Sequence, residues 1–246
     1  MHLSDNAVTI VHPTVEPITL AEARRYLRID VPGYQGDTAQ DDFIRSCITG
    51  SRRCLEENTD RSIGVQTIMV GAPSFTHLAN CYDTYSGTGI ELPYGPIRSI
   101  ASIKYLTSDG QDLTVDAASY RLTETPPQRI VLRPGRSWPS ASMEPDSVRV
   151  TYVAGYGPAA RGLYDQPDTY ADEYASDYSD SNEPNIPATV ADRFTIPESL
   201  VIALRLLVGH YYVNRGAVIS PERGSAPEMP LGVQWIVWPN RASIGL

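Results

Sequence analysis

The spacing of apolar residues changes twice along this chain, and this change restricts the fold more than any other feature. Between Phe43 and Leu55, apolar side chains recur every three or four positions, as in a helix with one buried face. From Val65 to Val153 they alternate with polar residues in short runs, as in strands. Helical spacing returns at Leu200. The sequence therefore predicts an α+β fold: a small helical bundle of about four helices with an inserted antiparallel β module.

Start and stop signals place the helices. Thr19 and Glu22 have the spacing of a capping box and predict a helix over residues 20–28. A second helix is expected to start at Thr38 and a third at Pro197, the latter ending at Gly216. The buried face of the second helix is predicted to hold Phe43, Ile44, Cys47, Ile48, Ser51, Cys54 and Leu55. That of the third is predicted to hold Leu200, Val201, Leu204, Leu207, Val208, Tyr211 and Tyr212.

Runs rich in β-branched and aromatic residues, separated by Gly, Pro, Ser and Asp, predict the strands. They cover residues 65–70, 100–106, 113–115, 120–123, 129–132 and 148–153, with an extended lead at 7–11. Asp109-Gly110 is a pair that tight hairpins prefer. Gly155-Tyr156-Gly157 is interpreted as a turn leaving the sheet, because Pro158 follows and no third glycine completes a phosphate-binding loop.

Four parts of the chain are expected. Residues 1–64 form the N-terminal helical part of the core, 65–157 the β module, 158–196 an acidic insertion rich in Tyr and Asp, and 197–246 the third long helix with a C-terminal docking tail. Residues 161–193 hold eight acidic and two basic residues, which is six of the chain's nine net negative charges. A solvated acidic loop is the default interpretation, with one helical stripe allowed by Tyr170, Tyr174 and Tyr178.

Charge and hydropathy exclude several classes. A net charge of −9 argues against a protein that coats DNA, because such binding depends on Lys and Arg displacing counterions from phosphates. The start of the chain lacks the pattern of a secretory signal, and the longest apolar stretch, near Leu200, is far shorter than the ~20 residues that span a bilayer. Cys47 and Cys54, seven apart in one predicted helix, would be ~10 Å apart and so reduced.

The sequence offers few candidate catalytic or metal-binding residues, and we expect neither a catalytic residue, nor a bound metal, nor a cofactor. The four histidines, His2, His12, His77 and His210, have no nucleophile motif beside them, and His210 is expected to be a half-buried structural residue. An alternative from another class is a small metal-dependent hydrolase that uses His77, Cys81 and the acidic loop, although zinc would need further ligands. A carbohydrate-binding module is a further alternative, suggested by 15 tyrosines and three tryptophans.

The apolar C-terminal tail is the best candidate for a binding site. Residues 231–238 are too few to hold a helix alone, since isolated helices below ~12–15 residues are marginal in water, so their shape must come from docking. Trp235 and Trp238 would share a helical face, and Trp is a preferred anchor at interfaces. Docking on the chain's own core and docking on a neighbour both stay open. The predicted docking residues are Leu231, Val233, Trp235, Ile236 and Trp238.

Several motifs in a fixed order carry a family resemblance over almost the whole chain apart from residues 159–195. They are Pro17-Ile18-Thr19-Leu20-Ala21-Glu22-Ala23 with Tyr26-Leu27-Arg28, Leu55-Glu56-Glu57-Asn58-Thr59, Gly135-Arg136-Ser137-Trp138-Pro139, Val148 through Gly157, Leu206 through Arg215, and Pro230-Leu231-Gly232-Val233 with Trp238-Pro239. Together these motifs resemble the head-to-tail connector, or adaptor, proteins of tailed phages, which also occur in prophages and gene transfer agents.

The resemblance implies a non-enzymatic virion protein, made in the bacterial host cytoplasm and located in the neck. Its expected partners are the portal protein, neighbouring copies in a ring that is commonly twelve-fold, and a downstream stopper or tail-terminator protein. Packaged DNA would pass the lumen without specific binding, and no membrane is involved. The tail with Trp235 and Trp238 would dock on the portal or on an adjacent subunit. A stopper or tail-completion protein of the same neck is the alternative.

Overall fold

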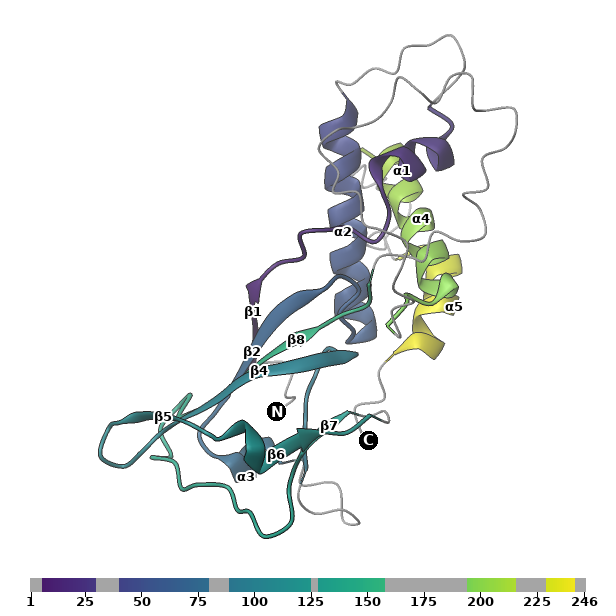
Figure 1. Ribbon diagram of the computed structural model, residues 1–246. Helices are drawn as coiled ribbons and strands as arrows, with labels where there is room; N and C mark the ends of the chain where they lie inside the picture. Colours follow the sequence, from purple (N-terminus) through teal and green to yellow (C-terminus); the bar gives the residue numbers. More distant parts are fainter. Residues whose placement is uncertain are drawn as a thin grey trace, which may run out of the picture.

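The computed structural model describes residues 6–29, 40–79, 89–124, 128–157, 194–215 and 229–241. The longer helices gather at one end of the molecule and the sheets at the other, which confirms the α+β class (Figure 1). The four longer helices are α1 (Leu20–Leu27), α2 (Asp41–Thr59), α4 (Glu198–Val213) and α5 (Leu231–Asn240). Most of the acidic insertion, together with Thr38, Cys81 and Gly216, lies outside the described residues.

The helices pack around one apolar core. The capping box at α1 is confirmed: the Thr19 side chain accepts from the Glu22 backbone N–H, and the Glu22 carboxylate accepts from the Thr19 N–H at 2.7 Å. The predicted faces of α2 and α4 are buried or half-buried, as expected from their spacing. Helix α5 closes the core with Val233 and Val237. The core comprises residues from all four helices, with Ile18, Ile63 and Ile196 added from the connecting segments.

The β module contains two antiparallel sheets. One has the strand order β1-β2-β8-β4-β5 and the other the order β3-β7-β6. The strands are β1 (Ala7–Val11), β2 (Gln66–Ala72), β3 (Gly89–Glu91), β4 (Ile97–Leu106), β5 (Asp112–Thr114), β6 (Tyr120–Leu122), β7 (Arg129–Leu132) and β8 (Val148–Ala154). The predicted hairpin joins β4 to β5, with Gly110 at a positive φ of 76°.

The structure differs from the sequence-based expectation within the β module. Strand β1 pairs with β2, so residues 7–11 belong to the sheet rather than to the helical part in which the expected boundary at residue 64 places them. Strand β3 and the short helix α3 (Phe75–Leu78) were not predicted. Both are too short to show a period, and their shape comes from packing: Phe75, Leu78 and Ile90 are buried in a second apolar core, that of the β module.

The helical end and the β module are joined where α2 leads into β2 and where β8 ends (Figure 1). Gly155 lies at this junction with φ of 121°, and a Cβ there would come within 2.1 Å of the Gly64 carbonyl oxygen. The interpretation of Gly155-Tyr156-Gly157 as a turn leaving the sheet is therefore confirmed in physical terms: only glycine permits this backbone angle and this approach.

Candidate docking surface

Helix α5 divides its apolar residues between two sides. Val233 is fully buried and Val237 nearly so, whereas Leu231, Trp235 and Trp238 are 71%, 79% and 81% exposed. At about 100° per residue, the three exposed side chains fall within about 60° of one another, and the two valines lie on the opposite side. One side of α5 therefore holds the helix on its own subunit, and the other side presents two indole rings to the outside.

Exposed apolar residues also lie on α4, the helix that packs beside α5. The two helices run antiparallel, because Ser199 at the start of α4 hydrogen-bonds Asn240 at the end of α5, while Leu206 lies beside Gly232. Leu206 and Ile202, one turn apart on α4, are exposed large apolar residues. We call the set Ile202, Leu206, Leu231, Trp235 and Trp238 the α4–α5 apolar face. Large apolar side chains gathered on a surface mark interaction sites in soluble proteins.

The predicted docking residues therefore lie on two different sides of α5. Leu231, Trp235 and Trp238 point outward, but Val233 belongs to the subunit's own core and Ile236 is half-buried against it. Val233 is not available for a partner, because it packs against the chain's own helices. Of the two docking sites left open by the sequence, the chain's own core binds the side of α5 that carries Val233 and Val237. The side with Leu231, Trp235 and Trp238 stays exposed in the subunit. Ile202 and Leu206 were missed as docking residues, although the predicted buried face of this helix already left both of them out.

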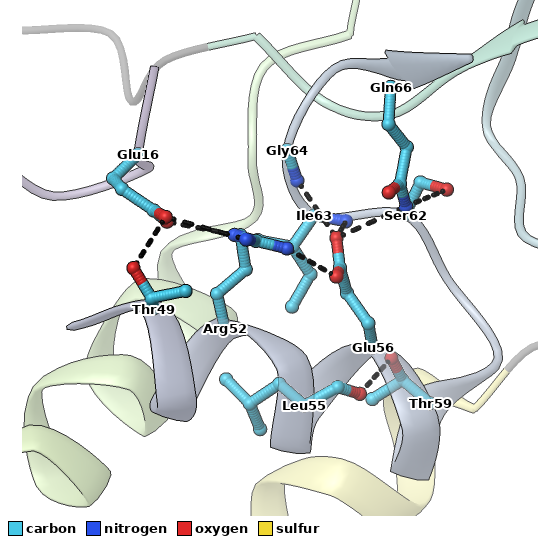
Figure 2. A network of polar contacts seen from close by, with 10 residues as sticks. All are labelled: Glu16, Thr49, Arg52, Leu55, Glu56, Thr59, Ser62, Ile63, Gly64 and Gln66. Carbon is cyan, nitrogen blue, oxygen red and sulfur yellow. Dashed lines mark hydrogen bonds and ion pairs between the residues drawn. The ribbon is translucent and has the colours of Figure 1, made fainter. Parts of the chain in front are cut away.

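A polar network joins the helical core to the start of the β module (Figure 2). Arg52 on α2 donates to Glu56 Oε2 at 2.6 Å and to Glu16 Oε2 at 2.8 Å. The other Glu56 oxygen accepts from the backbone N–H groups of Ile63 and Gly64 at 2.9 and 3.2 Å. Arg52 and Glu56 are both buried. The network fixes the direction in which the chain leaves α2, because one carboxylate binds both the helix and the linker.

Burial and pairing act in opposite directions on these two groups. Burial raises the pKa of Glu56, and the Arg52 charge and the backbone donors offset this only in part. Burial lowers the pKa of Arg52, but the hydrogen bonds and charges of Glu16 and Glu56 raise it by more, so the net change is upward. Arg52 therefore stays charged, whereas burial moves Glu56 towards its protonated form.

The raised pKa of Glu56 predicts a pH dependence of stability. The folded chain binds this proton more tightly than the unfolded chain, so the contribution of Glu56 is full below its ordinary pKa of 4.5 and declines as the pH rises through the folded value. Urea unfolding of wild type and Glu56→Gln from pH 4 to 7 should show the stability of wild type relative to the variant falling with pH. All other carboxyl groups are common to both chains. A relative stability that rises with pH would contradict the assignment.

The residues considered for chemistry do not come together in the described part of the chain. His77 is exposed on α3, whereas Cys81 and the acids of residues 158–193 lie outside it. Among the described residues, no three His, Cys, Asp or Glu side chains are grouped as metal ligands. His210 is half-buried, as expected, and its ring Nδ1 lies 3.2 Å from the Asn214 amide. None of the described helices is long and apolar enough to cross a bilayer.

Helices around one core, with an antiparallel β module formed by β1 and by the strands between α2 and α4, place the chain in the α+β class. No family model matches the sequence, and no curated protein sequence does. The chain is similar to one in a structure described as the neck of an empty GTA particle computed with C6 symmetry: the TM-score is 0.64 at 18% identity, covering 98% of this chain and 97% of the other.

Two further structures agree. The virion of a native gene transfer agent (GTA) particle contains a chain with a TM-score of 0.60 at 18% identity, covering 96% of this chain and 97% of that one. The neck of a native GTA particle computed with C12 symmetry contains one with a TM-score of 0.54 at 17% identity and the same coverage, 96% and 97%. At these identities the likeness concerns the fold, and it extends over the whole chain. The resemblance seen in the sequence motifs is confirmed at that level.

Proposed function

We propose that this chain is a structural protein of a particle neck: an adaptor whose copies form a ring under the portal, join the DNA-filled head to the next neck or tail component, and let DNA pass. The observation that carries the proposal is the combination of a fold shared along its full length with GTA neck and virion chains and an exposed α4–α5 apolar face. A monomer with no partner would leave two indole rings in water.

A ring subunit needs two unlike surfaces that fit each other, because head-to-tail contacts close into a cycle only when the two are complementary. The α4–α5 apolar face supplies one apolar surface, which docks on the portal or on an adjacent copy. The net charge of −9 suits a wall beside packaged DNA, since an acidic surface does not bind phosphates. The similar neck structures were computed with six- and twelve-fold symmetry, which supports a cyclic arrangement, and we expect twelve copies.

The alternative within the same neck is a stopper or tail-completion protein, which would occupy the next ring down and bind an adaptor instead of the portal. The fold supports both assignments equally, since the similar structures are described only as necks and a virion. The adaptor and stopper assignments differ in the protein directly above the ring, which is the portal for an adaptor and an adaptor for a stopper.

The test is reconstitution with the portal of the same particle. Purified full-length chain is mixed with assembled portal rings, and the complex is analysed by mass photometry and electron microscopy. We expect one added ring on the portal, with the α4–α5 apolar face covered. A chain that stays monomeric beside intact portals, and that occupies the ring below another protein in an imaged neck, would contradict the adaptor assignment and favour the stopper.

A further inference from the structure

The C-terminal end of α5 satisfies only part of its own backbone: the Asn240 amide donates to the Ile236 carbonyl at 2.8 Å and the Arg241 N–H to the Trp238 carbonyl at 3.3 Å. Pro239 lies inside this ten-residue helix and has no N–H to donate to the Trp235 carbonyl one turn earlier. The last carbonyls of any helix also lack intrahelical donors, and a helix this short is marginal by itself in water. The remaining carbonyls at the end of α5 need donors from elsewhere in the chain.

Side chains and carbonyls of other elements meet this end. Arg61 Nε donates to the Asn240 carbonyl at 2.6 Å, a charged donor at a helix C-terminus. Arg241, the next residue, donates to the Asn58 carbonyl at the end of α2 at 3.0 Å. The Asn240 amide donates to Ser199 Oγ in the first turn of α4 at 3.3 Å. The helix end is thus held by α2, by α4 and by the linker that follows α2.

Arg61 also contacts the β module. Its Nη1 donates to Tyr156 Oη at 3.0 Å, just after β8 ends. Its backbone forms a bridge with Tyr94, and the next residue, Ser62, donates its N–H to the Gly95 carbonyl at 3.1 Å. One guanidinium therefore touches both the last residue of α5 and the segment that leaves the large sheet.

We propose that Arg61 is a positioning residue for α5: its guanidinium, between the Asn240 carbonyl and Tyr156, fixes the helix and its two outward tryptophans relative to the β module before any partner binds. The consequence of this positioning for docking rests on the proposed function. A preformed helix binds without the entropy cost of being ordered at the interface, so positioning raises affinity without touching the partner.

Hydrogen exchange of the isolated full-length chain, followed by mass spectrometry, tests the proposal without a partner. Arg61→Ala should accelerate exchange of amides in residues 231–241 by about tenfold, the lower end expected for losing a hydrogen bond from a charged donor. Amides of β2 and β8 should keep their wild-type rates. Arg61→Lys keeps the charge but not the planar guanidinium that reaches both oxygens, so its exchange rates in residues 231–241 should lie between those of wild type and Arg61→Ala.

A matched variant separates positioning from docking. Trp235→Ala/Trp238→Ala removes the exposed rings and should leave exchange in α5 at the wild-type rate, because neither ring holds the helix on its core. Unchanged exchange in Arg61→Ala would overturn the proposal, whatever the portal experiment shows. If Arg61→Ala accelerates exchange throughout the chain, the variant Tyr156→Phe, which removes only one acceptor of the guanidinium, is measured instead. Faster exchange confined to α5 in that variant supports positioning, and unchanged exchange in α5 overturns the proposal.

Discussion

Replacing Arg52 by methionine should lower the free energy of unfolding by about 3–5 kcal/mol, the range found when one partner of a buried ion pair is removed. Methionine keeps most of the length and apolar volume of the stem, so the effect reports the charge and its hydrogen bonds rather than a cavity. Arg52 is 3% exposed and its two carboxylate partners would lose their donor together. Urea denaturation at pH 7 measures the change.

The large effect is expected because the carboxylate left behind cannot leave its site. Glu56 still accepts from the Ile63 and Gly64 N–H groups, and burial already raises its pKa. Without the cation, the charged form would be buried with only neutral donors, the Ile63 and Gly64 N–H groups and the Gln66 amide, so Glu56 would take up a proton at a higher pH than in wild type. The loss of stability should therefore be smaller at pH 5 than at pH 7.

Two controls make the result specific. Arg53→Met changes the neighbouring, exposed arginine and should alter stability by no more than about 0.5 kcal/mol. The double variant Arg52→Met/Glu56→Gln removes both charges and should recover part of the loss, since an uncharged amide is less costly to bury than an unpaired carboxylate. If Arg52→Met is as harmless as Arg53→Met, the network does not hold the junction.

Local patterns were enough to predict the elements whose own residues determine their shape. The capping box at Thr19, the apolar face of α2 and the hairpin at Asp109-Gly110 all involve residues that are close in sequence, and all were found. Strand bounds were correct to within three residues for the same reason, because alternation is a local signal.

Features that depend on distant residues were not predictable in this way. The pairing of β1 with β2 brings together segments some sixty positions apart, and Glu16 and Arg52 are separated by 36. Nothing in the local sequence marks such partners. Within the candidate site, a tail that is apolar on every side does not show which side faces inward, so Val233 and Trp235 looked equivalent. The position of α4 decides between them, by covering one side of α5 and not the other.

Replacing both exposed tryptophans should have the largest effect on assembly. Trp235→Ser/Trp238→Ser should weaken binding to the partner at the α4–α5 apolar face by at least about a hundredfold, because a central Trp anchor commonly contributes 2 kcal/mol or more and the two act in one patch. Stability should change by no more than about 0.5 kcal/mol, since both side chains are about four-fifths exposed and make little of the core. Affinity for portal rings by biolayer interferometry and unfolding by urea provide the two readouts.

Point substitutions suit this question better than removal of residues 231–246, because such a deletion would also remove Val233 and Val237 from the core and unsettle the subunit itself. Met143→Ser is the matched control: this side chain is apolar and 67% exposed, but it lies in the β module away from α5. It should bind as wild type does. If the double tryptophan variant also binds and forms rings as wild type does, the indole rings are not the anchors, and the contact must be sought on another surface of the subunit.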